Sequence, residues 1–130
     1  MFKRILIIDD DENFCKIVKM NLELRVEAEK KFNVITATDG NAGIKQAKQF
    51  RPDLILLDIM MPKTDGFKVL EALKKDKSTM TIPVVMLTGR DDDEAKAETL
   101  KLYNEAYLTK PIDAKGLREK IEEIFKVRGI

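Results

Sequence analysis

Five short apolar segments, each followed by a stretch with helical periodicity, constrain the fold of this chain more than any other feature. The predicted strands cover residues 3–8, 33–38, 54–57, 83–87 and 106–109, and the predicted helices cover residues 13–29, 41–50, 67–75, 92–102 and 114–127. Strands without polar interruptions are typical of a parallel sheet covered by helices on both faces. No repeat, linker or shift in composition divides the sequence. It therefore predicts a single (βα)5 domain of the α/β class over residues 1–130.

Composition excludes several kinds of chemistry. The chain has 24 Lys and Arg against 23 Asp and Glu, so its net charge of +1 gives no reason to expect binding to nucleic acid or to anionic membranes. The absence of His removes imidazole bases, His-ligated zinc and a phosphohistidine carrier, and one Cys excludes an internal disulfide. No apolar run matches a signal peptide or a membrane span. We therefore expect a cytoplasmic protein whose chemistry depends on carboxylates, hydroxyls and lysine.

Polar residues stand at the ends of four of the five predicted strands. Asp9 and Asp10 follow the first strand, Asp58 the third, Thr88 the fourth and Lys110 the fifth. Right-handed crossovers place the carboxyl ends of parallel strands at one edge of the sheet, and in the doubly wound order 2-1-3-4-5 these four strands are neighbours. We therefore expect the five side chains to converge at that edge.

The convergence of three carboxylates predicts a metal and a phosphoryl group. Nearby like charges repel strongly, and a divalent cation together with a lysine would neutralise them. Carboxylate and carbonyl oxygens with retained waters suit Mg²⁺, which usually accompanies phosphoryl groups in proteins. Thr88 adds a hydroxyl, and Gly89 leaves room beside it for a small anion. We expect transfer of a phosphoryl group to Asp58, which stands singly at the end of a central strand.

Four stretches in this order resemble the receiver domain of bacterial two-component response regulators. They are ILIIDDDEN (5–13), PDLILLDIMMPKTDGF (52–67), PVVMLTGRDD (83–92) and YLTKPID (107–113). The resemblance extends from residue 3 to residue 127 and implies the flavodoxin-like fold. It also implies that Asp58 accepts phosphate from a histidine kinase or a phosphotransfer protein, and that no external substrate is turned over.

The resemblance further implies a ligand set for the metal. Asp10, Asp58 and the backbone carbonyl of Met60 would bind Mg²⁺ (or Mn²⁺) directly, and Asp9 would bind it mainly through water.

The remaining pocket residues would respond to the phosphoryl group. Thr88 would donate a hydrogen bond to a phosphoryl oxygen, and Lys110 would form an ion pair with it. Tyr107 matches the aromatic residue whose ring moves inward behind the threonine in this family. The peptide bond between Lys110 and Pro111 would be cis, which only an X-Pro bond adopts at small cost.

The family also implies two surfaces for partners. Phe14, Cys15, Ile17 and Ile112 match the surface on which kinases dock, although the first explanation of Cys15 is an inert residue early in the helix. The first predicted helix runs about one turn longer than is usual, through residues 25–29, either as a longer docking helix or as a short extension.

Phosphorylation would bias a surface formed by the segments 92–102, 106–109 and 114–127. A downstream effector protein, or an output domain outside this chain, would bind there.

Four other aspartates are explained as helix caps. Asp11, Asp39, Asp65 and Asp113 each precede a predicted helix, where a carboxylate accepts a hydrogen bond from a free backbone N–H.

Two rival functions fit parts of the pattern. An Asp-x-Asp motif after an apolar strand also begins the haloacid-dehalogenase-like phosphohydrolases, with Asp9 as nucleophile and Asp11 as acid/base. That reading leaves Asp58 without a role, and the late acidic motif and the cap domain of those enzymes are absent. The other rival is a pseudo-receiver that binds partners constitutively, against which the complete set of pocket residues argues.

Overall fold

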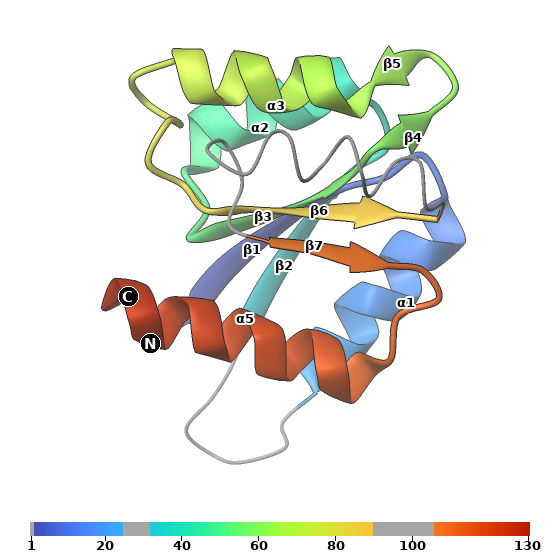
Figure 1. The fold of residues 1–130 in the computed structure, drawn as a ribbon, viewed down its shortest axis with the longest axis vertical. Coiled ribbons are helices and arrows are strands. Elements are labelled where there is room, and N and C mark those ends of the chain that lie inside the picture. Colours follow the sequence, from blue (N-terminus) through green and yellow to red (C-terminus); the bar gives the residue numbers. More distant parts are fainter. Residues whose placement is uncertain (1, 25–31, 90–105) are drawn as a thin grey trace.

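The computed structural model describes residues 2–24, 32–89 and 106–130 (Figure 1). In chain order the elements are β1 (Lys3–Ile8), α1 (Glu12–Glu23), β2 (Phe32–Ala37), α2 (Gly40–Phe50), β3 (Leu54–Asp58), β4 (Met60–Met61), β5 (Thr64–Asp65), α3 (Gly66–Lys75), β6 (Val84–Thr88), β7 (Ala106–Thr109) and α5 (Ala114–Arg128). The helix predicted over 92–102 lies outside the described residues. Within the described ranges, no helix is both long enough and apolar enough to cross a membrane.

One sheet of five parallel strands forms the centre of the molecule. Its order is β2-β1-β3-β6-β7, which is the predicted order 2-1-3-4-5 when only the strands of this sheet are numbered. The doubly wound α/β prediction is therefore confirmed. The segment predicted as a loop after β3 contains a small antiparallel hairpin, β4–β5, in which Met60 faces Asp65 and Met61 faces Thr64. Strands of two residues are too short to produce an alternation that a sequence could show.

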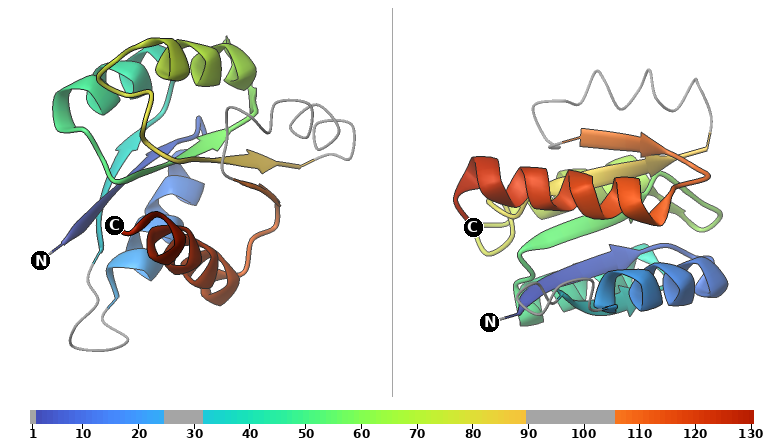
Figure 2. Two further views of the ribbon diagram at one scale, coloured as in Figure 1. Left: turned by 60° about the vertical axis from the view of Figure 1, so that its left-hand side comes forward. Right: turned by 90° about the horizontal axis from the view of Figure 1, so that it is seen from below.

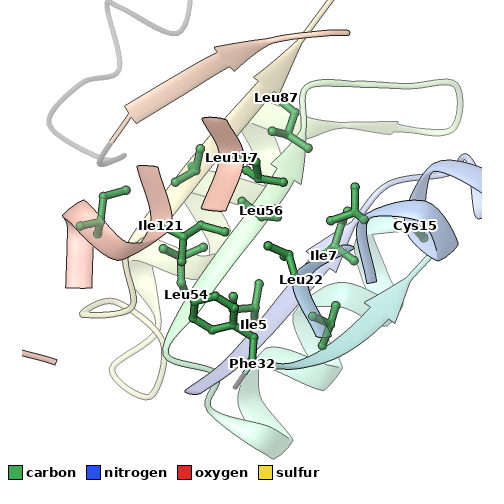
Figure 3. Packing of buried hydrophobic residues seen from close by; sticks show 14 of the residues in the cluster. Ile5, Ile7, Cys15, Leu22, Phe32, Leu54, Leu56, Leu87, Leu117 and Ile121 are labelled. Carbon is green, nitrogen blue, oxygen red and sulfur yellow. The ribbon is translucent and has the colours of Figure 1, made fainter. Parts of the chain in front are cut away.

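Each face of the sheet carries its own hydrophobic cluster. Helices α1 and α5 cover one face and helices α2 and α3 cover the other, as the views in Figures 1 and 2 agree. Successive strand residues point to opposite faces, so Ile5 and Ile7 pack toward α1 and α5 (Figure 3), whereas Leu6 and Ile8 pack toward α2 and α3. Each fully buried aliphatic side chain contributes about 1.5–3 kcal/mol of transfer free energy. Burial on both faces explains why the strands are apolar throughout.

Aspartate caps begin the four described helices, as predicted. The pairs of accepting carboxylate and donating backbone N–H are Asp11 with Phe14, Asp39 with Ala42, Asp65 with Phe67, and Asp113 with Gly116. A cap of this kind contributes about 1 kcal/mol. These carboxylates therefore hold the backbone, and the cap gives Asp11 a structural role that needs no phosphohydrolase chemistry.

Helix α1 is shorter than predicted. It ends at Glu23, and Leu24 follows in extended backbone. The guanidinium of Arg118 on α5 donates to the carbonyl oxygens of Asn21 and Leu24, in the last turn and at the C-cap of the helix, where carbonyl groups commonly need partners from outside the helix. The alternative of a longer docking helix is therefore wrong. Residues 25–31 lie outside the described residues, so the short extension stays a prediction.

Candidate functional site

The carboxyl ends of β1, β3, β6 and β7 lie at one edge of the sheet, toward which the strand arrowheads in Figure 1 point. Backbone pairing sets the place of each polar residue there. Asp58, the last residue of β3, is in register with Leu87, and Thr88 follows directly on β6. The backbone N–H of Lys110 donates to the carbonyl of Thr88 at 2.6 Å, which continues the pairing of β6 with β7 beyond the strand. The ladder thus brings residues from distant parts of the chain to one pocket.

Three carboxylates come together in this pocket. Asp9, Asp10 and Asp58 each offer a carboxylate oxygen within 4.8 Å of the other two. Asp9 and Asp58 are buried and Asp10 is exposed, so a bound ion would contact protein oxygens on one side and water on the other. Hard oxygen ligands combined with retained water match the preference of Mg²⁺. The donor set therefore fits Mg²⁺, the ion that the resemblance implies.

Lys110 supplies the positive charge of the pocket. Its Nζ lies 2.7 Å from Oδ2 of Asp9 and 3.7 Å from Oδ2 of Asp58. Burial alone would lower the pKa of Lys110, but the hydrogen bond to Asp9 and the charges of Asp58 and Asp9 raise it above its usual value. The lysine is therefore charged at neutral pH and contacts both buried carboxylates.

Asp58 ionises less readily than an ordinary aspartate. Burial and, after it, the negative charge of Asp9 raise the pKa of Asp58 to about 7. Lys110 and the backbone N–H of Met60 oppose this rise. The Met60 N–H donates to Oδ1 at 3.1 Å, while Oδ2 faces the lysine. A divalent cation in the pocket would favour the ionised form, which is the nucleophilic one.

Thr88 and Gly89, which are neighbours at the end of β6, differ in how closely other atoms surround them. Thr88 is fully buried, whereas a Cβ built on Gly89 would meet no atom of the described residues within 4 Å. Among these residues there is therefore open space directly after Thr88. Tyr107 is half-buried and packs against the cluster on the α2 and α3 face. The peptide bond between Lys110 and Pro111 is cis.

Gly66 is a residue of the site that sequence reasoning missed. A Cβ at this position would lie 2.5 Å from the carbonyl oxygen of Asp58 and 2.6 Å from Cα of Ile59, so a larger residue would displace the backbone that carries Asp58. From the sequence, Asp65 and Gly66 are explained by a turn and a helix cap alone, so no close approach to Asp58 is predicted. The close approach depends on the β4–β5 hairpin, which folds α3 back onto the end of β3.

The expected docking residues are not equally accessible. Ile17 is 58% exposed, and Phe14 and Ile112 are partly buried against the α1 and α5 cluster. Cys15 is buried, and its thiol donates to the carbonyl of Asp9 at 3.4 Å. Burial, followed by the charge of Asp9, raises the pKa of this thiol to about 12. Cys15 is therefore part of the support of the pocket and contributes no surface to a partner.

Comparison with known proteins agrees with this geometry. The family model of the response regulator receiver domain matches residues 5–122. The chain is 36% identical to the alkaline phosphatase synthesis transcriptional regulatory protein PhoP of Bacillus subtilis, over 97% of this chain and 50% of that protein. It is 38% identical to the response regulator PleD of Caulobacter vibrioides, over 98% of this chain and 27% of that protein. It thus spans half or less of the length of these relatives.

Solved structures give the same result. A CheY-like receiver domain protein from Methanospirillum hungatei superimposes with a TM-score of 0.85 at 29% identity, covering 99% of this chain and 98% of that one. The chemotaxis response regulator CheY4 of Vibrio cholerae gives a TM-score of 0.83 at 25% identity, covering 95% and 99%. Neither result favours the phosphohydrolase alternative. With the family model, the relatives and the fold in agreement, this chain belongs to the receiver domains of two-component response regulators.

Proposed function

We propose that this receiver domain is a Mg²⁺-dependent switch in which Asp58 accepts a phosphoryl group from a histidine kinase or a phosphotransfer protein. One observation carries the proposal. The carboxylates of Asp9, Asp10 and Asp58 lie within 4.8 Å of one another, and the ammonium of Lys110 contacts two of them. Such a cluster of like charges is costly unless it binds a cation and the phosphoryl group that accompanies it.

The reaction is a transfer at phosphorus. A carboxylate oxygen of Asp58 attacks the phosphorus of the donor while the bond from phosphorus to the leaving group breaks. The leaving group is an imidazole nitrogen of phosphohistidine or a carboxylate oxygen of acetyl phosphate, and it keeps the bonding electron pair. The switch is reset by hydrolysis: water attacks the phosphorus of the aspartyl phosphate, the bond from phosphorus to the Asp58 oxygen breaks, and inorganic phosphate is released. The domain thus modifies itself and turns over no external substrate.

Asp10, Asp58 and the carbonyl of Met60 would hold Mg²⁺ (or Mn²⁺) directly, with Asp9 acting through water. When bound, the ion supplies positive charge for the phosphoryl oxygens on which negative charge develops. Asp9 in addition holds the ammonium of Lys110 at 2.7 Å, so its carboxylate orients the second positive group of the pocket.

Lys110 and Thr88 would bind the transferred group. The ammonium, 3.7 Å from Asp58, is positioned to pair with a phosphoryl oxygen, and the Thr88 hydroxyl would donate to another across the open space beside Gly89. Movement of Thr88 toward the phosphoryl group would leave space for the ring of Tyr107. The new position of this ring would change the surface around β7, α5 and residues 92–102.

The partners follow from the surfaces of the domain. Phe14, Ile17 and Ile112 remain as the surface for a kinase or phosphotransfer protein. Several relatives are named transcriptional regulatory proteins and are about twice as long as this chain. The switch surface would therefore be read by an output domain or by a separate effector protein, and these partners would meet the domain in the cytoplasm.

Mass spectrometry of the intact protein tests the proposal. We expect the wild type to gain one phosphoryl group from acetyl phosphate when Mg²⁺ is present, and Asp58→Asn to gain none. No gain in any condition would contradict the proposal and support the pseudo-receiver. A gain that survives Asp58→Asn would instead place the nucleophile at Asp9, as in the phosphohydrolases.

A further inference from the structure

We propose that Phe14 is a positioning residue for phosphoryl transfer, because the face of its ring holds the Lys110 ammonium beside Asp58. The inference rests on the proposed function and adds a residue to its machinery. Phe14 was expected only on the docking surface. It lies in the first turn of α1, and Lys110 lies in the segment between β7 and α5. The start of α1 and this segment are both at the carboxyl end of the sheet, on the right in Figure 1.

The ammonium of Lys110 contacts one aromatic ring and two carboxylates. Its Nζ is 4.3 Å from the centroid of the Phe14 ring, well within the distance of about 6 Å at which a cation and an aromatic face attract each other. On the pocket side, the same Nζ contacts Asp9 at 2.7 Å and Asp58 at 3.7 Å. The ring therefore adds a third attractive contact to the ammonium that the two carboxylates hold.

Backbone and packing contacts hold the ring in this place. The N–H of Phe14 donates to the capping carboxylate of Asp11 at 3.1 Å, which orders the first turn of α1. The ring is partly buried against the α1 and α5 cluster, where Ile112 also packs. Its position is thus set by the same elements that build the pocket.

The ring matters most when the pocket contains a cation. Lys110 is a compact charge on a flexible stem, and the attraction of Asp9 and Asp58 keeps it in the pocket. A divalent cation neutralises part of that attraction, whereas an apolar ring binds no Mg²⁺ and still attracts the ammonium. Without the ring, the lysine would turn more easily into water and would be absent when the phosphoryl group arrives.

Acetyl phosphate separates this role from docking, because it phosphorylates without a kinase. We expect Phe14→Leu to lower the rate constant of phosphorylation at saturating Mg²⁺ about three- to tenfold, the range for a partly exposed cation–π pair. Phe14→Tyr keeps an aromatic face and should stay within about twofold of the wild type. The matched control is Phe50→Leu, which removes a ring that faces the guanidinium of Arg4 at 5.5 Å, away from the pocket.

A double-mutant cycle assigns the effect to the lysine. If Phe14 acts through Lys110, Phe14→Leu should have no further effect on the rate in a Lys110→Met background. Site-specific 3,4,5-trifluorophenylalanine at position 14 is a second test, since it weakens the ring's attraction for cations with little change in shape. Its rate should fall between those of the wild type and Phe14→Leu.

NMR provides a readout that is independent of phosphorylation. The ε-methylene protons of Lys110 should be shifted upfield by the ring in the wild type and in Phe14→Tyr, and should return to ordinary positions in Phe14→Leu. An unshifted signal in the wild type, or an equal rate in Phe14→Leu, would overturn the inference while leaving phosphorylation of Asp58 intact. If the wild type gains no phosphoryl group at all, the proposed function fails and this role fails with it.

Discussion

The acidic pocket lies at the carboxyl end of the sheet and the turn between α3 and β6 lies at its amino end. The two regions differ in the partners of their carboxylates, which are like charges in the pocket and hydrogen-bond donors and a lysine in the turn. In the pocket, the buried carboxylates of Asp9 and Asp58 face each other, and the pKa of Asp58 is raised to about 7 by burial and by Asp9. In the turn, the carboxylate of Asp76 accepts hydrogen bonds from Ser78 and forms an ion pair with Lys48. These contacts lower its pKa to about 2.

The α3–β6 turn (residues 76–83) therefore gains stability from its polar groups, whereas the repulsion between the pocket carboxylates is only partly offset by Lys110 until a divalent cation is bound. Fully complementary contacts suit a part of the molecule that must stay unchanged. Like charges held close together by a rigid sheet are instead prepared for a ligand of opposite charge. Removal of a carboxylate should therefore stabilise the pocket and destabilise the turn, and only substitutions in the pocket should change the rate of phosphorylation.

The largest effect should come from removing the lysine of the pocket. Lys110→Met leaves the buried carboxylate of Asp9 without its partner at 2.7 Å, so we expect a loss of about 3 kcal/mol in chelator. Mg²⁺ should restore part of the loss, because it neutralises the same carboxylates. Urea unfolding with and without Mg²⁺ measures both. An unchanged free energy of unfolding would show that the pocket tolerates its charges without the lysine.

In the turn, Thr79 provides the matching test. It is fully buried, and its hydroxyl donates to the carbonyl of Leu73 at 2.6 Å, near the end of α3. Thr79→Val should cost about 1–3 kcal/mol, because it leaves that carbonyl without its donor. The rate of phosphorylation by acetyl phosphate should not change. A large fall in the rate at a temperature where the variant is folded would contradict the separation of the two regions.

Removal of the acceptor carboxylate should have the opposite sign. Asp58→Asn keeps an oxygen for the N–H of Met60 and removes a charge that repels Asp9, so it should raise the free energy of unfolding by about 1–2 kcal/mol in chelator at pH 7.5. Mg²⁺ should stabilise the wild type more than the variant, since the variant has lost a ligand. A destabilised Asp58→Asn in chelator would show that the pocket carboxylates do not oppose folding.

The smallest effect concerns acid stability of the turn. Hydrogen bonds from the Ser78 hydroxyl and N–H, followed by Lys48, lower the pKa of Asp76 from 3.8 to about 2. A lowered pKa in the folded state contributes stability above pH 4 that is lost as the pH falls from about 4 to about 2. The difference in stability between wild type and Asp76→Asn should therefore shrink across this window. A constant difference would mean that the hydrogen bonds do not depend on the charge.

Local signals explain which predictions succeeded. The strand Leu54–Asp58 is apolar on both faces and ends in a single aspartate. Its position in the middle of the sheet and its polar carboxyl end could therefore both be predicted. Capping by Asp11 and Asp113 was equally readable, because a cap depends on residues within three positions. The end of α1 was not, because Arg118 closes it from α5, 97 residues further along the chain. The docking alternative for Cys15 is wrong for the same reason, since this residue is buried in the cluster that α1 forms with the strands and α5.

The sequence by itself determined the alternation of strands and helices and the polar residues at the strand ends. These depend on the periodicity and chemistry of short segments, while the order of the strands was inferred from the general rules of parallel sheets and from the family resemblance. Only the tertiary structure decided that Gly66 abuts the backbone of Asp58. It also decided that Lys110 contacts both the ring of Phe14 and the carboxylate of Asp9, 101 residues away in the chain. The physical reason is that direction and distance between side chains from separate elements arise from packing, which no local pattern records.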